Sequence, residues 1–204
     1  MNNFFVNTRS SIKITGSKII YFDPLDIEGE PHDADMIFVT HEHYDHFSPD
    51  DIKKVIKKNS QIIVPETMLS IVREMEFMTQ SVHGVIPFQE GKDEDIKWKG
   101  IPAYNIDKPY HIKSNNWLGY LVEMDGKTYY AMGDTDVTKE VAMVEADVVF
   151  VPIGGKYTMD ATEAALFIKE KKPGLVVPIH YGASEVAETF VRLLSPNMET
   201  KVFW

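Results

Sequence analysis

The feature that most constrains this chain is a cluster of histidines between a predicted strand and a predicted helix. Residues 40–46 read Thr-His-Glu-His-Tyr-Asp-His, so three of the seven histidines fall within six residues. An apolar run at residues 36–39 precedes the cluster, and Ser48 followed by Pro49, a helix-start signal, comes after it. Layered α/β folds build their sites in loops of this kind.

The residue types in the cluster indicate metal binding. Neutral imidazole nitrogens and carboxylate oxygens are good ligands for divalent metals. The chain contains no cysteine, so a transition-metal site must use nitrogen and oxygen ligands. The alternative interpretation is an exposed polar turn that is rich in histidine.

Further candidate ligands follow two other apolar strands. Asp134 comes after residues 129–132, and His180 comes after residues 176–179. If these strands lie side by side, their ends bring the candidate ligands together. Taken alone, Asp134 could be a turn aspartate with Asp136 as an alternative carboxylate, and His180 could be a core histidine.

The pattern His-x-His-x-Asp-His resembles the signature of the metallo-β-lactamase-fold hydrolases at every fixed position. Residues 133–135, 152–155 and 178–181 are similar, in order and separation, to landmarks of the branch that resembles L-ascorbate-6-phosphate lactonase. The resemblance covers nearly the whole chain. It implies a four-layer αββα sandwich, an α/β (α+β) fold, whereas the element order alone also allows a single doubly wound sheet.

The resemblance also implies two divalent metal ions. His41 and His43 would hold the first ion, and Asp134 would bridge the two. The second ion would be held by three further side chains: Asp45, His46 and His180. Two ions about 3.5–4 Å apart would share a water and lower its pKa toward neutral, giving a hydroxide nucleophile. Zinc is the expected metal, with manganese, iron and nickel as alternatives.

The third histidine of the first ion is not where the branch usually has it. That branch carries Ala-x-His before the Gly-Asp-Thr element, whereas residues 103–105 here read Ala-Tyr-Asn. We expect His111, six residues after Asn105, to be the displaced ligand. His83 begins an apolar strand and is expected to be structural, and His32 is expected to be exposed.

Leaving-group protonation requires an acid. Tyr181 and Tyr157 are the candidates, with Lys156 as a further one. Asp45 could orient the hydroxide as well as bind metal. Residues 154–159 precede a predicted helix, so their backbone could bind an anion at the helix N-terminus. The alternative is a plain strand-to-helix connection that needs its glycines.

Periodicity and turn signals predict the regular elements. A hairpin is expected at residues 11–22 and ends at Asp23-Pro24. In the resembling family this aspartate lies near the site without binding metal; a turn that ends the strand is the alternative. A second hairpin should turn at Asp125-Gly126. Other strands are expected at residues 36–40, 62–65, 82–87, 95–104, 118–132, 148–153, 175–179 and 201–204. Helices are expected from residue 48 with lysines through residue 58, at about 66–77, at 160–172 with a capping box, and at 184–194.

Composition limits the partners. Lys and Arg number 21 against 31 Asp and Glu, a net charge of −10, which disfavours nucleic acid and anionic membranes as partners. We find no signal peptide, no apolar run that could span a bilayer and no disulfide evidence, which together indicate the cytoplasm. The 204 residues have no linker and suit one domain, residues 1–204. A homo-oligomer is left open.

These observations predict a metal-dependent hydrolase. Its substrate would be a small, anionic ester, either a lactone or a phosphodiester. Fold likeness does not carry substrate identity, so the choice between them stays open. The alternative is a metal-binding regulatory or interaction protein that kept the ligands without turnover.

Overall fold

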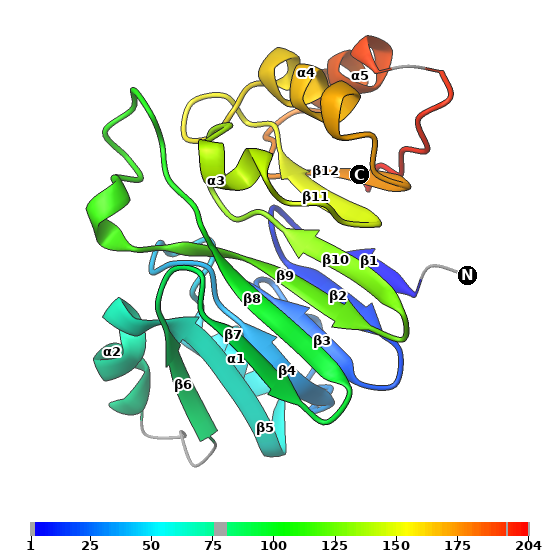
Figure 1. The fold of residues 1–204 in the computed structure, drawn as a ribbon. Helices are drawn as coiled ribbons and strands as arrows, with labels where there is room; N and C mark the ends of the chain where they lie inside the picture. Colours follow the sequence, from blue (N-terminus) through cyan, green and yellow to red (C-terminus); the bar gives the residue numbers. More distant parts are fainter. Residues whose placement is uncertain (1–2, 76–80, 195, 204) are drawn as a thin grey trace. The chain divides into compact units, whose positions relative to one another are not determined.

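The computed structural model describes residues 3–75, 81–194 and 196–203. The chain divides into two compact units, Met1–Ile86 and Pro87–Trp204, called unit 1 and unit 2 below. Each unit contains one six-stranded sheet with both parallel and antiparallel neighbours (Figure 1). The assignment of residues 1–204 to a single domain stays a prediction.

The sheet of unit 1 follows the chain in the order β1-β2-β3-β4-β5-β6. Its strands are β1 (Phe4–Val6), β2 (Ile12–Thr15), β3 (Ile19–Phe22), β4 (Ala34–Phe38), β5 (Ile56–Pro65) and β6 (Ser81–Val85). The antiparallel pairing of β2 and β3 confirms the first predicted hairpin. From β3 to β6 the strands run parallel, so the chain must cross over between them. Helix α1 (Pro49–Val55) makes the crossover from β4 to β5, and η1 (Glu66–Met68) with α2 (Leu69–Arg73) makes the next.

Helix α1 begins where the sequence indicates. The Ser48 hydroxyl accepts a hydrogen bond from the Asp51 amide and donates one to the Asp51 carboxylate, and Pro49 occupies the first turn. The helix ends at Val55, however, and not at residue 58. Residues 56–58 already belong to β5, because Ile56 is extended and pairs with Ala34 of β4. A buried strand position thus overrode the helical periodicity of this stretch.

The sheet of unit 2 has the order β12-β11-β10-β9-β8-β7. Its strands are β7 (Glu90–Asp93), β8 (Ile96–Pro102), β9 (Leu118–Met124), β10 (Lys127–Ala131), β11 (Val148–Pro152) and β12 (Leu175–Ile179). Asp125 and Gly126 both have positive φ, 53° and 71°, as a two-residue hairpin turn requires, so this prediction is confirmed. Strands β11 and β12 are parallel to β10 and buried along their whole length.

Two longer helices pack within unit 2. Helices α4 (Ala161–Lys171) and α5 (Ser184–Leu193) lie side by side near β11 and β12 (Figure 1). Phe167 and Ile168 of α4 belong to one apolar core with Val151 and Val176 of the sheet. The predicted capping box at Asp160 is confirmed. A third helix, α3 (Lys139–Ala142), is short.

Several element predictions need correction. Strands β1 and β7 and helix α3 were not predicted, because each is only three or four residues long. The predicted helix at 66–77 is η1 and α2, and Phe77 lies outside the described residues. Residues 201–203 do not form a strand, and Trp204 lies outside the described residues. Among the described helices, none has the length and apolarity that crossing a bilayer would need.

Candidate metal centre

The histidine loop, residues 40–46, connects β4 to α1. It is folded tightly, because the N–H groups of His46 and Phe47 both donate to the carbonyl of His43, each at 2.9 Å. Three candidate ligands in it are buried: His41, Asp45 and His46. His43 is partly exposed, and Tyr44 points its side chain into solvent.

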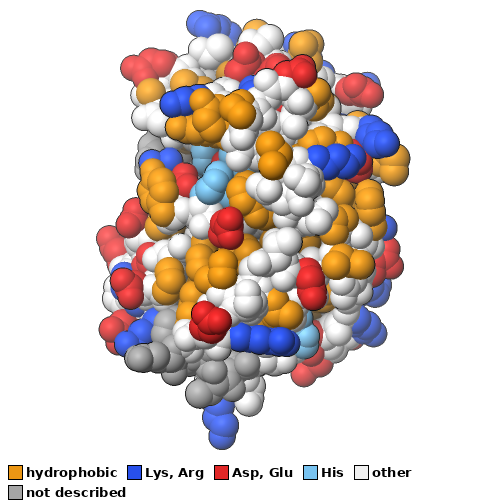
Figure 2. Space-filling model, turned by 90° about the vertical axis from the view of Figure 1, so that its left-hand side faces the viewer, with side chains coloured by type: hydrophobic (Ala, Val, Ile, Leu, Met, Phe, Trp, Pro, Cys, Tyr) orange, Lys and Arg blue, Asp and Glu red, His pale blue; other side chains and the backbone are white. Residues whose placement is uncertain are grey.

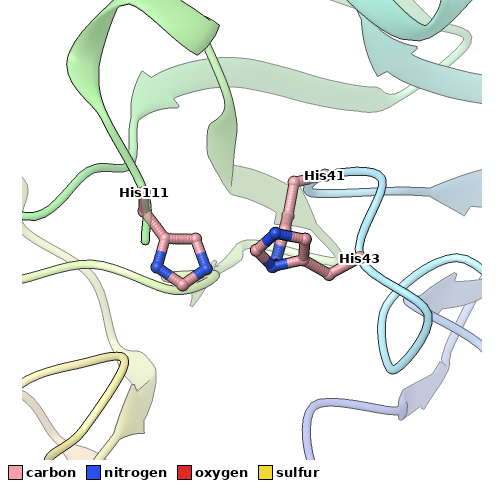
Figure 3. A group of neighbouring side chains, drawn as sticks. All are labelled: His41, His43 and His111. Carbon is pink, nitrogen blue, oxygen red and sulfur yellow. The ribbon is translucent and has the colours of Figure 1, made fainter. Parts of the chain in front are cut away.

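The imidazole rings of the loop lie against one another. Nε2 of His41 is 3.1 Å from Nδ1 of His43, and the ring centres of His41 and His46 are 4.0 Å apart. Figure 3 shows His41 and His43 leaving the same loop. Ring nitrogens at this separation have the spacing that ligands of one metal ion adopt.

The buried carboxylate of Asp23 orients the histidine loop. Its carboxylate accepts hydrogen bonds from the Thr40 N–H and the Thr40 hydroxyl, both at 2.7 Å, and lies 2.7 Å from Nδ1 of His46. Burial raises the pKa of Asp23, and the contacts with His46 and Thr40 oppose that shift. Because three donors converge on it, we assign the carboxylate form, which leaves Nε2 as the ligating nitrogen of His46. Asp23 therefore does more than end a strand.

A second set of candidate ligands, the Asp134 cluster, lies in unit 2 and consists of His111, Asp134 and His180. Oδ2 of Asp134 is 3.3 Å from Nε2 of His111 and 3.2 Å from Nε2 of His180. All three side chains are buried. Gly133 precedes the aspartate with φ of 64°, a conformation that favours glycine, so it sets the backbone turn that delivers Asp134.

Asn105 explains the departure from the Ala-x-His pattern. Its Oδ1 is 3.0 Å from Nδ1 of His111 and also accepts a hydrogen bond from the His111 N–H. Its Nδ2 donates to the Tyr157 carbonyl at 2.9 Å and to Asp136 at 3.2 Å. An amide oxygen can only accept, so His111 carries its proton on Nδ1 and presents Nε2 as the ligand atom. Figure 3 shows His111 on the segment between β8 and β9.

Gly154 makes room for His180. A Cβ at position 154 would lie 2.4 Å from the carbonyl oxygen of His180 and 3.3 Å from its Nδ1. Any larger residue would therefore push the end of β12 away. His180 itself has a left-handed backbone, with φ of 54°. A strained backbone at a candidate ligand is typical of functional sites.

The candidate acids differ in their surroundings. The Tyr181 hydroxyl donates a hydrogen bond to the carbonyl of Phe203 and so anchors the C-terminal segment; its role as an acid stays a prediction. Tyr157 remains a candidate because its side chain is exposed. Hydrogen bonding to Tyr157 raises the pKa of Lys156, which keeps the lysine charged and makes it the poorer donor.

The expected anion site at residues 154–159 is also not supported. The N–H groups of Thr162 and Glu163, at the start of α4, already bond to the Asp160 carboxylate. The N–H of Gly154 donates to the Thr158 hydroxyl, and the preceding loop is similarly bonded to itself. The stretch is therefore a strand-to-helix connection whose N–H groups named above already have acceptors within the same segment.

Three alternative ligands are placed elsewhere. Asp136 bonds to Lys108 at 2.7 Å and to the Ile106 N–H, so it serves the loop structure. His83 is exposed and lies 2.9 Å from the Ser81 hydroxyl. His32 is exposed as predicted.

Sequence reasoning missed two polar groups. Arg9, in a polar turn, lies 3.1 Å from Asp45 of the histidine loop. Glu140 accepts hydrogen bonds from Tyr104 at 2.7 Å and Lys113 at 2.9 Å, the residues on either side of the segment that carries His111. Burial raises the pKa of Glu140, but those two donors outweigh it and lower the pKa to about 2. Nothing in the residue order marks either contact.

The donor sets fit a divalent metal ion. All seven predicted ligands are imidazoles or carboxylates, which suit zinc and its neighbours. The second ring nitrogens of His46 and His111 are held by buried acceptors, as in metal-ligating histidines generally. On the face drawn in Figure 2, histidine side chains reach the surface among acidic and hydrophobic ones.

Comparison with known proteins defines the class. The model of the beta-lactamase superfamily domain matches residues 8–180. The chain therefore belongs to the metallo-β-lactamase superfamily. The predicted fold class, the αββα type of α/β fold, is confirmed.

The relatives are metal-dependent hydrolases. A UPF0173 metal-dependent hydrolase of Thermococcus onnurineus is 31% identical over 189 residues, covering 84% of this chain and 81% of the relative. One of Pyrococcus abyssi is 31% identical over 217 residues, covering 93% and 90%. The structure of a proposed metal-dependent hydrolase from Parabacteroides distasonis has a TM-score of 0.80 at 25% identity, covering 96% and 89%. The prediction that this chain is a metal-dependent hydrolase is thereby confirmed.

Proposed function

We propose that this hydrolase cleaves a small ester that carries an anionic group, a lactone or a phosphodiester, with two divalent metal ions. One observation carries the proposal. Each unit presents buried nitrogen and oxygen donors with a histidine locked in its ligating tautomer, His46 by Asp23 and His111 by Asn105. Such outer contacts are a regular feature of metal sites.

We assign the ligands in three groups. The first ion would be held by His41, His43 and His111. The second would be held by Asp45, His46 and His180. Asp134 would be shared between the two ions. The close imidazole rings of the histidine loop, and the contacts of Asp134 with His111 and His180, support these assignments. Zinc is the preferred metal, since its usual ligands are of these types, and manganese, iron and nickel tolerate the same set.

The protein side chains would divide the remaining work. When bound, the two ions would lower the pKa of a water and polarise the carbonyl or phosphoryl group that the water attacks. The Asp45 carboxylate would orient that water, and the exposed Tyr157 hydroxyl would protonate the leaving group. The lactonase-like landmarks at residues 133–135, 152–155 and 178–181 support a lactone as the ester. The partner is a small molecule and not nucleic acid.

Metal content and turnover test the proposal together. Protein purified without added metal would be analysed for bound ions and assayed with an anionic lactone, a neutral lactone and a phosphodiester. We expect two ions per chain and turnover of an anionic ester. Two ions per chain with no turnover of any ester would refute the hydrolytic proposal and favour the regulatory alternative.

A matched pair of variants tests the displaced ligand. His111→Ala should lose one ion per chain, because it removes a buried ligand nitrogen. His83→Ala, at an exposed histidine outside both donor sets, should keep both. Equal metal content in the two variants would remove His111 from the site.

A further inference from the structure

The polar turn between β1 and β2 delivers a cation to the histidine loop. Nη1 of Arg9 lies 3.1 Å from Oδ2 of Asp45. The arginine side chain is 46% exposed, whereas the aspartate side chain is 12% exposed. The guanidinium is planar and carries five N–H donors, so a single contact to Asp45 uses a small part of its capacity.

The turn is held in place independently of the ion pair. The Asn7 N–H donates to the Ser11 carbonyl at 2.9 Å, and the Ser11 N–H donates to the Thr8 carbonyl at 2.7 Å. The Asn7 side chain donates to the Leu25 carbonyl at 2.7 Å, and the Leu25 N–H donates to the Ser11 hydroxyl. The turn that carries Arg9 is therefore held by hydrogen bonds that do not involve the ion pair.

The ion pair with Asp45 does not by itself account for the backbone conformation of Arg9. Arg9 has φ of 46°, a left-handed conformation that is unfavourable for a non-glycine residue. A half-exposed ion pair contributes little to stability. The backbone cost is thus not repaid by the contact with Asp45. Left-handed non-glycine residues recur at functional sites, and Arg9 combines this backbone with a side chain that reaches a predicted metal ligand.

We propose that Arg9 binds the anionic group of the substrate, a carboxylate or a phosphate, beside the predicted metal ligand Asp45. This inference rests on the proposed function and adds its recognition group. Guanidinium donors match the two oxygens of a carboxylate or phosphate bidentately. Asp45 holds Nη1 of Arg9, and other N–H donors of the half-exposed guanidinium would meet the incoming anion.

Anion binding by the metal-loaded protein tests this role without turnover. The dissociation constants of inorganic phosphate and acetate would be measured by calorimetry for the wild type, Arg9→Gln and Arg9→Lys. A charge-assisted hydrogen bond is worth about 1.5–3 kcal/mol, so Arg9→Gln should weaken one of the two anions by roughly 10- to 100-fold. Arg9→Lys should lose less anion affinity than Arg9→Gln, because lysine keeps the positive charge although it lacks the paired N–H donors of the guanidinium. The anion that is affected identifies the substrate group.

The control is Arg73→Gln, a change at an exposed arginine of α2 that should leave anion binding unchanged. Bound metal would be quantified in every variant. The inference is overturned if Arg9→Gln binds both anions within twofold of the wild type, if the wild type binds neither, or if the variant loses metal, since the arginine would then act on Asp45 alone. Absence of ester turnover with intact anion binding would instead count against the hydrolytic proposal.

Discussion

Asn105 offers the sharpest test of how the site is built. Asn105→Ala removes four hydrogen bonds, two with His111 and one each with Asp136 and Tyr157. At about 1 kcal/mol each, discounted for relaxation, the free energy of unfolding should fall by roughly 2–4 kcal/mol. For a chain of this size the midpoint of thermal unfolding should fall on the order of 10 °C.

Asn105→Ala should also weaken metal binding, and this effect is measured separately from the loss of stability. Loss of the Oδ1 acceptor frees the His111 ring to rotate and to exchange tautomers, so Nε2 is no longer presented. Removing such an outer contact typically costs about 10- to 100-fold in metal affinity. Competition with a chromophoric chelator would measure this directly on folded protein at 25 °C.

Two further variants define the outcome. Asn105→Asp keeps an acceptor for His111 but places a second carboxylate beside Asp136, so it should lose stability while retaining more metal affinity than the alanine variant. Asn3→Ala changes an exposed asparagine of unit 1 and should leave both the free energy of unfolding and the metal affinity unchanged. If Asn105→Ala binds metal as tightly as the wild type while His111→Ala does not, the orienting role assigned to Asn105 is wrong.

Three other changes have defined expectations. Tyr130→Phe should raise the free energy of unfolding by about 1 kcal/mol in urea titrations, because the Tyr130 hydroxyl is buried and makes no hydrogen bond with the described residues; a loss would contradict this. Gly154→Ala should cost about 1–3 kcal/mol and displace His180, whereas Gly182→Ala, which meets no atom within 4 Å, should be tolerated. For Glu140→Gln, the folded-state pKa of about 2 lies below the ordinary 4.5, so the ionised carboxylate stabilises the fold above about pH 4.5. The stability difference from the wild type, measured on metal-free protein, should therefore shrink as the pH falls toward 2; a constant difference would refute the assigned pKa.

Much of the fold follows from local rules. Ser48 and Asp160 each satisfy backbone N–H groups at a helix start, and Asp125-Gly126 adopts the positive φ values that a tight hairpin needs. These features depend on neighbours within four residues, so they can be read from the residue order. Strand β5 could not, because Ile56 joins it through pairing with Ala34, 22 positions earlier in the chain.

The site shows the same division. The identity of the donors, the histidine loop above all, is a property of the sequence, because imidazole and carboxylate chemistry belongs to the residue. Their orientation is not. The contacts of His46 with Asp23, of His111 with Asn105 and of Asp45 with Arg9 were decided only by tertiary structure.

The physical reason is the distance along the chain over which each effect acts. Ligand type, helix caps and turn conformations are set by a few adjacent residues, and the sequence by itself determined these, together with the superfamily. Three features depend on a partner far away in the chain: the tautomer of a histidine, the hydrogen bond from Tyr181 to Phe203, and the charge that Arg9 brings to the loop. Only folding brings such partners within hydrogen-bonding distance, so only the tertiary structure could decide them.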